Sequence, residues 1–486
     1  RPIEYEVLAP RDCEAMFDLL TYEKGASVLR MLEQHLGPET FRDGVRLYLN
    51  RHAYANAETT DLWRALGDAG RLPIPDVMDA WVFRPGYPLV SVEADGPRLR
   101  LGQRRFTYLE PDAAESGLWR VPVTIRAALD GQVIERRLLL EAPEADLGLP
   151  SPADWVVANA GGHGFYRVRY APALLDRLAA ALGELLPIER FNLVSDLQAL
   201  ALAGLLPATE YLTRTGAFRE ETDRNVWAVL IASFAYTNRV LDDATRPGLG
   251  ALVRHRVGPA AARLGWEPRP GESELQRQLR GDLLRALGIL GDDPETQRRA
   301  RELYARYLDD ATALDPNVLP AVIAIVAFTG GVPEYAAFLD RFKHARTPQE
   351  EQRYLYALAG FRQRELIQQT LERTINGEIR TQDAPYVVRT LLTGVYARGL
   401  AWEFVKAHWE TMARLYPPSA YRRMYEGVTG LVSPAWEREV QAFFPERGIV
   451  LGGKTLEQYL EQLRVAVRFQ EREAAALAAY LTQRPG

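Results

Sequence analysis

Three polar side chains stand together near the start of the chain, in the order Tyr22, Glu23 and Lys24. A tyrosine hydroxyl can donate a hydrogen bond to a developing oxyanion without carrying a charge. A glutamate and a lysine could act as general base and general acid. Each also has a structural interpretation: Tyr22 as a packed aromatic at a helix start, Glu23 as an acid favoured in the first turn, and Lys24 as a tie to neighbouring groups. For Glu23 and Lys24 we favour the structural interpretation.

Hydrolysis of peptides at a zinc ion needs three protein ligands and an open position for water. The chain contains no His-Glu-x-x-His sequence, and no two of its six histidines are close together. These histidines are His35, His52, His163, His255, His344 and His408. We therefore expect no metal ligands in this chain. The stretch Gly161–Gly164 is not a phosphate-binding loop, because no Lys-Ser/Thr follows it, and we interpret it as a turn between strands.

The composition narrows the range of partners. Apolar residues make up 47% of the 486 residues and charged residues 25%, with a net charge of −5. No apolar run approaches the roughly 18 residues of a membrane span, and no basic stripe indicates a nucleic-acid partner. We expect neither a membrane nor a nucleic acid as partner. The single cysteine, Cys13, can form no internal disulfide, which favours a cytoplasmic location.

The first of three zones, residues 1–84, holds the polar cluster and is predicted to be helical. Apolar residues at helical spacing run from Val28 to Leu36. Gly37 is predicted to end this helix and Pro38 to begin the next one. The cluster at Tyr22 would therefore stand at the start of the first of these helices.

The second zone, residues 85–170, is predicted to consist of short strands. Residues 88–94 and 98–101 flank Asp95-Gly96-Pro97, and residues 121–127 and 133–140 flank Asp130-Gly131. Each pair predicts a hairpin, because a turn sequence separates two runs of strand-forming residues. Such a series of short strands predicts a small antiparallel β-sandwich.

The third zone, residues 171–486, is predicted to be almost entirely helical. Apolar stripes recur at helical spacing, and short turns such as Gly291-Asp292-Asp293-Pro294 separate them. The pattern favours irregular helix pairs stacked as a HEAT-like solenoid. One large irregular helical domain is the alternative. The whole chain is thus predicted to be multidomain and mainly α.

Several motifs along the chain share one resemblance. They are Tyr22-Glu23-Lys24-Gly25, Trp81 with Pro85-Gly86-Tyr87-Pro88, Asn159 with Gly164-Phe165-Tyr166-Arg167-Val168, and Asp196-x-x-Ala199-Leu200-Ala201. In this order they resemble the M1 family of zinc aminopeptidases, gluzincins that remove single residues from peptide N-termini. The resemblance becomes weaker toward Ala401–Trp409. Four residues such as Tyr-x-Lys-Gly are weak alone, but agreement in order over nearly the whole chain is specific.

The resemblance implies a fold for each zone. Residues 1–84 would be the tail of a thermolysin-like catalytic domain, residues 85–170 the β-sandwich domain, and residues 171–486 the helical C-terminal domain, similar to that of endoplasmic-reticulum aminopeptidases. It also implies that Tyr22 hydrogen-bonds the oxyanion of the tetrahedral intermediate. Tyr166 and Arg167 could line the substrate chamber or serve only the strand that carries them.

The parts of the family's site that this sequence lacks limit the functional prediction. The zinc-binding helix and the Gly-x-Met-Glu-Asn motif for the substrate's amine are both missing, so the substrate-binding residues stay unknown. We expect the C-terminal portion of a zinc aminopeptidase, inactive alone, with zinc in the intact enzyme. Its partners would be a peptide substrate and the N-terminal part of the same enzyme. The alternative is a non-catalytic helical solenoid that binds a peptide or protein.

Overall fold

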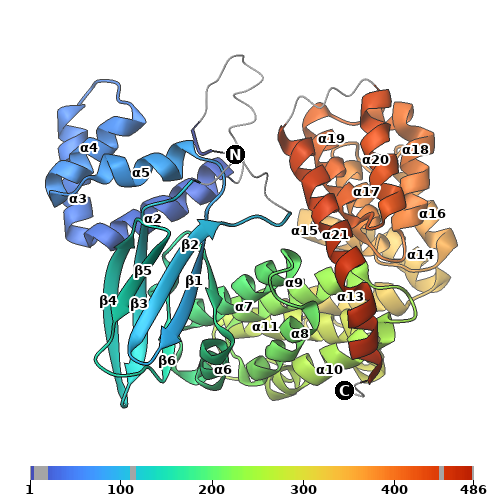
Figure 1. The fold of residues 1–486 in the computed structure, drawn as a ribbon. Helices are drawn as coiled ribbons and strands as arrows, with labels where there is room; N and C mark the ends of the chain where they lie inside the picture. Colours follow the sequence, from blue (N-terminus) through green and yellow to red (C-terminus); the bar gives the residue numbers. More distant parts are fainter. Residues whose placement is uncertain (1, 5–19, 110–116, 448–453, 484–486) are drawn as a thin grey trace. The chain divides into compact units, whose positions relative to one another are not determined.

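The computed structural model describes residues 2–4, 20–109, 117–447 and 454–483. The chain divides into two compact units, Arg1–Ala203 and Gly204–Gly486 (Figure 1). It is mainly helical with a small β region, as predicted. No helix within the described ranges combines the length and apolar character that a membrane span requires. The division into three domains stays a prediction.

The first unit opens with a group of helices. They are η1 (Leu20–Lys24, a π-helical turn), α2 (Gly25–Leu36), α3 (Pro38–Arg51), α4 (Thr59–Gly70) and α5 (Ile74–Phe83). The break between α2 and α3 lies at Gly37, where the backbone has a φ of 85° that favours glycine. The predicted end of one helix and start of the next are confirmed at this position. On α2 the buried stripe comprises Val28, Met31 and Leu32.

In the part of the chain that the structure describes, seven strands follow the helices and form two sheets. They are β1 (Pro88–Asp95), β2 (Arg98–Arg105), β3 (Val121–Leu129), β4 (Gln132–Leu140), β5 (Glu144–Gly148), β6 (Trp155–Val157) and β7 (Arg167–Tyr170). The strand orders are β5-β2-β1-β7 and β4-β3-β6. Both predicted hairpins, β1–β2 and β3–β4, are confirmed. At the second turn Asp130 and Gly131 both have positive φ, as a tight two-residue hairpin turn requires.

The prediction of purely antiparallel sheets is wrong at one strand. β7 pairs with β1 in parallel, with Val90 opposite Val168. Between these two strands the chain passes through the other sheet, and such a long crossover connection permits parallel pairing. β5 was not predicted either, because its sequence Glu-Ala-Asp-Leu-Gly contains no β-branched or aromatic residue.

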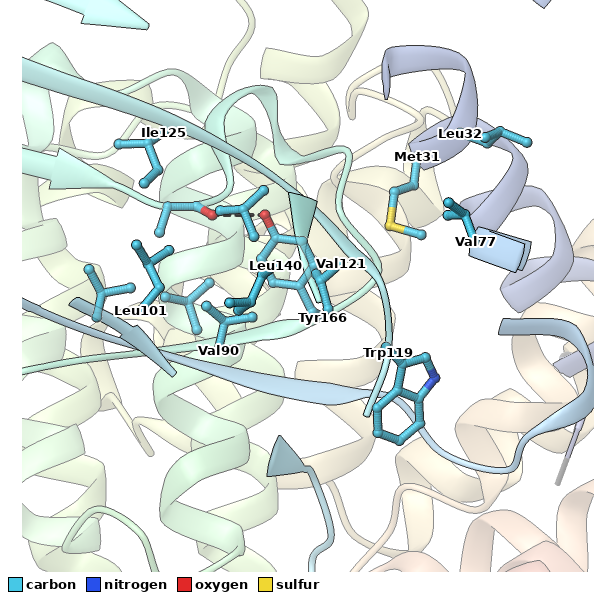
Figure 2. Close-up of a cluster of buried hydrophobic side chains, with 14 of the residues drawn as sticks. Met31, Leu32, Val77, Val90, Leu101, Trp119, Val121, Ile125, Leu140 and Tyr166 are labelled. Atoms are coloured by element: carbon cyan, nitrogen blue, oxygen red, sulfur yellow. Dashed lines mark hydrogen bonds between the residues drawn. The ribbon is translucent and has the colours of Figure 1, made fainter. Parts of the chain in front are cut away.

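One apolar core joins the helices and both sheets of the first unit. Met31 and Leu32 of α2, Val77 of α5 and inward-facing strand residues belong to the same buried cluster (Figure 2). Along β2 buried and exposed residues alternate, as expected for a strand with one covered face. The unit ends with α6 (Pro172–Ala180), η3 (Leu182–Glu184) and α7 (Pro187–Leu202). Helices α6 and α7 pack on the strands β6 and β7.

The second unit is entirely helical within the described ranges. Its α-helices are α8 (Ala208–Arg214), α9 (Arg224–Val240), α10 (Arg246–Leu264), α11 (Glu274–Arg285), α12 (Pro294–Asp309), α13 (Leu319–Thr329), α14 (Val332–Lys343), α15 (Pro348–Leu358), α16 (Arg364–Arg373), α17 (Ala384–Thr393), α18 (Arg398–Leu415), α19 (Pro418–Tyr425), α20 (Pro434–Glu446) and α21 (Lys454–Gln483). Shorter helical turns are η4 (Thr215–Glu220), η5 (Ala286–Leu290, π-helical) and η6 (Glu426–Gly430).

In this unit, every second helix along the chain packs against the next one in the same row. Helices α9, α11, α13, α15 and α17 pack side by side in that order, and α12 and α14 pack against α13 and α15. The central helix α13 has no charged residue and is buried over most of its surface. A helix that is apolar all round needs partners on every side, which this arrangement supplies.

Candidate functional site

The predicted oxyanion donor, Tyr22, lies in the π-helical turn η1 immediately before α2. Its side chain is 59% exposed, so the aromatic ring is not part of the buried core. The interpretation of Tyr22 as a packed aromatic at a helix start therefore does not fit its exposure. The catalytic role of Tyr22 stays a prediction.

Two residues further on, Lys24 is almost completely buried, with 4% of its surface exposed. Its Nζ donates hydrogen bonds to the backbone oxygens of Arg84 and Gly86, at 3.4 and 3.3 Å. These carbonyls belong to the junction between α5 and β1, where Gly86 has a φ of 87°. The structural interpretation of Lys24 is confirmed, because its ammonium ties the helix start that carries Tyr22 to this junction.

Glu23 faces solvent on the same turn, and its backbone oxygen accepts a hydrogen bond from Ser27 Oγ at 2.7 Å. An acidic side chain in the first turn of a helix is favoured by the partial positive charge there. The structural interpretation accounts for the position of Glu23.

The histidines lie on separate elements. His35 is half-buried on α2, where burial and then the charge of Arg137 lower the pKa of its imidazole. His163 lies in the turn before β7, where burial and then Arg30 lower its pKa. The other four lie at the end of α3, on α10, after α14 and on α18. Among the described residues no three His, Cys, Asp or Glu side chains are grouped so that they could hold a metal ion.

The glycine-rich stretch around His163 is a turn between strands, as predicted. Gly161 and Gly162 have positive φ values of 69° and 71°. Asn159 closes the turn, since its Oδ1 accepts from Gly164 N at 2.8 Å and its Nδ2 donates to Gly164 O at 3.1 Å. A cavity of about 180 Å³ lies beside this turn, between α2 and the sheet β4-β3-β6.

Tyr166 and Arg167, the residues that could line a substrate chamber, are held in the first unit's interior. The Tyr166 hydroxyl donates to Ala158 O at 2.8 Å. Arg167 Nη1 donates to Ser195 Oγ at 2.6 Å and to Asp196 Oδ1 at 3.1 Å, both on α7. The Arg167 contacts fasten β7 to α7, and the Tyr166 contact fastens the residue before β7 to the segment after β6, so the structural interpretation accounts for both residues.

The Arg167–Asp196 pair shows two opposed electrostatic effects. Burial raises the pKa of Asp196 to about 6, although the charge of Arg167 and the hydrogen bond from Val168 N act in the other direction. Burial acts to lower the pKa of Arg167, but the carboxylate of Asp196 and the phenols of Tyr87 and Tyr108 raise it above its ordinary value. For Asp196 we take burial as the larger effect, because the carboxyl is more deeply buried than its partner.

A second cavity, of about 710 Å³, lies wholly within the second unit. It is lined by residues from the C-terminal ends of α9, α11, α13, α15 and α17 and from the first half of α10. Sequence analysis did not single out these residues. They are dispersed over some six helices, and no local motif connects them.

Comparison with known families assigns both units. The family model described as ERAP1-like C-terminal domain matches residues 155–465, and the one described as peptidase family M1 domain matches residues 1–81. The first match alone covers more than half of the chain. This chain belongs to the M1 aminopeptidase family, and its sequence lacks the family's zinc-binding region.

Individual relatives agree with this assignment. The chain is 31% identical to aminopeptidase M1 of Arabidopsis thaliana, over 97% of this chain and 56% of that protein. It is 30% identical to a leucyl aminopeptidase of Saccharolobus solfataricus, over 94% and 56% of the two chains. It is 28% identical to glutamyl aminopeptidase of Homo sapiens, over 95% and 50%. The chain thus spans about half the length of the curated relatives it matches.

Proposed function

We propose that this chain is the C-terminal portion of a zinc aminopeptidase that hydrolyses N-terminal residues from peptides. In this proposal Tyr22 donates a hydrogen bond from its hydroxyl to the oxyanion that forms at the scissile carbonyl. One observation carries the proposal: in a member of the M1 family, Tyr22 is exposed on a helix start that Lys24 anchors. A donor held in place before the reaction stabilises developing charge without reorganising.

Zinc does not fit the side chains of this chain alone. The described residues offer no group of three metal ligands, and the sequence contains no His-Glu-x-x-His. We therefore derive no catalytic step through a metal here. In our proposal the N-terminal part of the same enzyme supplies the zinc site, the general base and the group that binds the substrate's amine, and this chain alone is inactive.

We also propose a fold type for each part of the chain. We infer that the helices from η1 to α5 are the tail of a thermolysin-like catalytic domain. The ordered packing of α9, α11, α13, α15 and α17 supports a HEAT-like solenoid, in which alternate helices form one layer. The three proposed domains comprise residues 1–84, 85–170 and 171–486.

We also propose the binding partners of this chain and its location in the cell. The partners are a peptide substrate and the enzyme's N-terminal part, and neither a nucleic acid nor a membrane is included. A cytoplasmic location rests on the single cysteine, Cys13, which lies outside the described residues. We propose no preference for a particular N-terminal residue.

An aminopeptidase assay tests the proposal directly. The chain alone and the same chain extended upstream along its reading frame are compared, with added zinc and a panel of aminoacyl fluorogenic substrates. We expect turnover only from the extended protein. Zinc-dependent turnover by this chain alone would contradict the proposal. An upstream frame that contains no His-Glu-x-x-His would instead favour the non-catalytic solenoid that binds peptides.

A further inference from the structure

The cavity in the second unit has the size of a small-molecule site. Its volume of about 710 Å³ lies within the range of roughly 300–1,000 Å³ that is usual for such sites. The helices whose C-terminal ends line it, α9, α11, α13, α15 and α17, are neighbours in one row, so residues from distant parts of the chain meet there. Figure 1 labels all five of these helices.

The charged residues lining this cavity are unequal in number, with four arginines and two aspartates. Two of the arginines are occupied within the protein. Arg246 pairs with Asp243 and donates from Nη2 to Leu241 O at 2.8 Å. Arg254 Nη1 donates to Gly291 O. Both hold backbone carbonyls at helix ends, which explains their presence without a ligand.

The other two arginines, Arg239 and Arg285, hold no backbone carbonyl in the described part of the chain. Within the described part of the chain, neither guanidinium donates a hydrogen bond or forms an ion pair, and Arg239 lies over the ring of Tyr236 at 4.7 Å. Arg239 is the penultimate residue of α9 and Arg285 the last residue of α11, and these two helices pack together. Two arginines from adjacent helices therefore line one cavity.

The side chains that line the cavity carry more positive than negative charge, whereas the helix C-termini there contribute partial negative charge. Burial lowers the pKa of Arg239. Burial, followed by the charges of Arg246 and Arg239, lowers the pKa of the neighbouring Arg398 to about 10. A negative charge beside the partly buried Arg239 would offset the cost of burying its guanidinium. An anion bound in the cavity would supply that charge.

Apolar and aromatic groups lie beside the arginines. Phe328 and Tyr396 both line the cavity, and Tyr396 is 46% exposed. Arg362 lies over both rings, at 4.1 Å from the Phe328 centroid and 5.4 Å from the Tyr396 centroid. This holds the Tyr396 side chain in place, where its ring can cover a flat apolar group.

We propose that this cavity binds a small organic anion, a phosphate or carboxylate carried on an aromatic or other apolar body. Arg239 and Arg285 donate hydrogen bonds to the anion's oxygens, since a guanidinium matches the geometry of both groups. Tyr396 and Phe328 contact the body. The proposal does not depend on the peptidase function, because it uses residues of the helical unit only.

A competing explanation needs no ligand. Arginines in the last turn of a helix are favoured by the partial negative charge at that end, and Arg239 and Arg285 both occupy such positions. Under this explanation, replacing either residue lowers stability slightly and changes no binding. The two explanations therefore differ in a measurable quantity.

Titration calorimetry on the full 486-residue chain separates them. The probes are phenyl phosphate, benzoate, inorganic phosphate and phenol. The variants are Arg239→Gln and Arg285→Gln, with Arg301→Gln as the matched control. Arg301 is an exposed arginine of α12 in the same unit and does not line the cavity, so its replacement removes the same charge elsewhere. Because Arg285 is exposed on the surface, its variant keeps the fold intact.

We expect phenyl phosphate or benzoate to bind with a 1:1 ratio, and the better of the two identifies the anionic group. Each of the two cavity variants is expected to weaken this binding about tenfold or more, and Arg301→Gln less than about twofold. Phenol is expected not to bind. Absence of binding by both organic anions, or equal weakening by all three variants, would overturn the proposal. Inorganic phosphate binding as tightly as phenyl phosphate would overturn the role of the apolar body.

Discussion

At the scale of single residues, Tyr22 and Lys24 are two positions apart and have opposite surroundings. Tyr22 is mostly exposed, whereas the ammonium of Lys24 is held under two backbone carbonyls. A buried lysine is costly unless it is hydrogen-bonded, so this contact must be maintained for the turn to keep its position. The arrangement places a largely exposed side chain on a turn that a buried lysine anchors.

Tyr22→Phe in the upstream-extended protein tests the proposed role of this hydroxyl. Removing one oxyanion donor costs about 10²–10³ in turnover, so kcat is expected to fall by that factor. KM is expected to change little, because the hydrogen bond forms only as the charge develops. Steady-state kinetics measure both. Tyr54→Phe is the control, since Tyr54 is a fully exposed tyrosine in the turn between α3 and α4. A fall in kcat of less than about threefold for Tyr22→Phe would refute the role.

The buried carboxyl of Asp196 is expected to make the free energy of unfolding depend on pH. Burial raises its pKa from 3.8 to about 6, so the folded carboxyl holds its proton more tightly than the unfolded one. Asp196 therefore makes the free energy of unfolding fall as the pH rises from about 4 to about 6. The stability advantage of the original chain over Asp196→Asn is expected to shrink over this range. Urea titrations, monitored by hydrogen exchange of the amides in β7 and α7, measure this difference in stability.

The control for that measurement is Asp154→Asn, because Asp154 is exposed in the same unit. Its effect on the free energy of unfolding is expected to be less than about 0.5 kcal/mol. If the advantage over Asp196→Asn instead grew as the pH rose, the charge of Arg167 would outweigh burial, and the pKa of Asp196 would lie below its ordinary value.

At the scale of elements, Gln103 joins the two sheets of the first unit. This buried residue of β2 donates from Nε2 to the oxygens of Trp119, Leu140 and Ala142, at 2.8, 3.1 and 3.1 Å. Its Oε1 accepts from Trp119 N at 3.0 Å. One amide thus satisfies backbone groups that lie where β3 begins and β4 ends.

Gln103→Leu is expected to reduce the free energy of unfolding by about 2–5 kcal/mol, because each buried polar group left without a partner costs about 1–3 kcal/mol. Leucine keeps the apolar contacts of the stem, so the loss reports on the hydrogen bonds. Chemical denaturation measures the change. Gln132→Leu, at the exposed start of β4, is expected to change stability by less than about 0.5 kcal/mol. Equal effects of the two substitutions would show that Gln103 does not join the sheets.

At the scale of the whole molecule, we propose that the zinc site lies in the N-terminal part of the enzyme and not in this chain. Elemental analysis of the purified chain after dialysis against zinc is expected to give well under about 0.1 zinc per chain, and the upstream-extended protein about one. The physical reason is that scattered histidines cannot approach the tetrahedral geometry zinc requires. One tightly held zinc in the chain alone would mean that residues outside the described ranges, or a rearranged set of histidines, bind it.

Local patterns determined much of the architecture from the sequence alone. The helix break at Gly37, both hairpins and the mainly helical second unit follow from periodicity and turn chemistry, which act over a few residues. The resemblance to the M1 family rested on the order of short motifs, and the family models confirm it. Tyr22 as a candidate also came from the sequence.

Contacts between distant segments were decided only by the tertiary structure. The parallel pairing of β7 with β1, the contact of Lys24 with the junction after α5, and the meeting of Arg239 and Arg285 at one cavity each join residues far apart in the chain. Periodicity reveals which face of an element is apolar but not which element covers it. That choice depends on the packing of all elements around a shared core, and it determines which side chains remain accessible for binding.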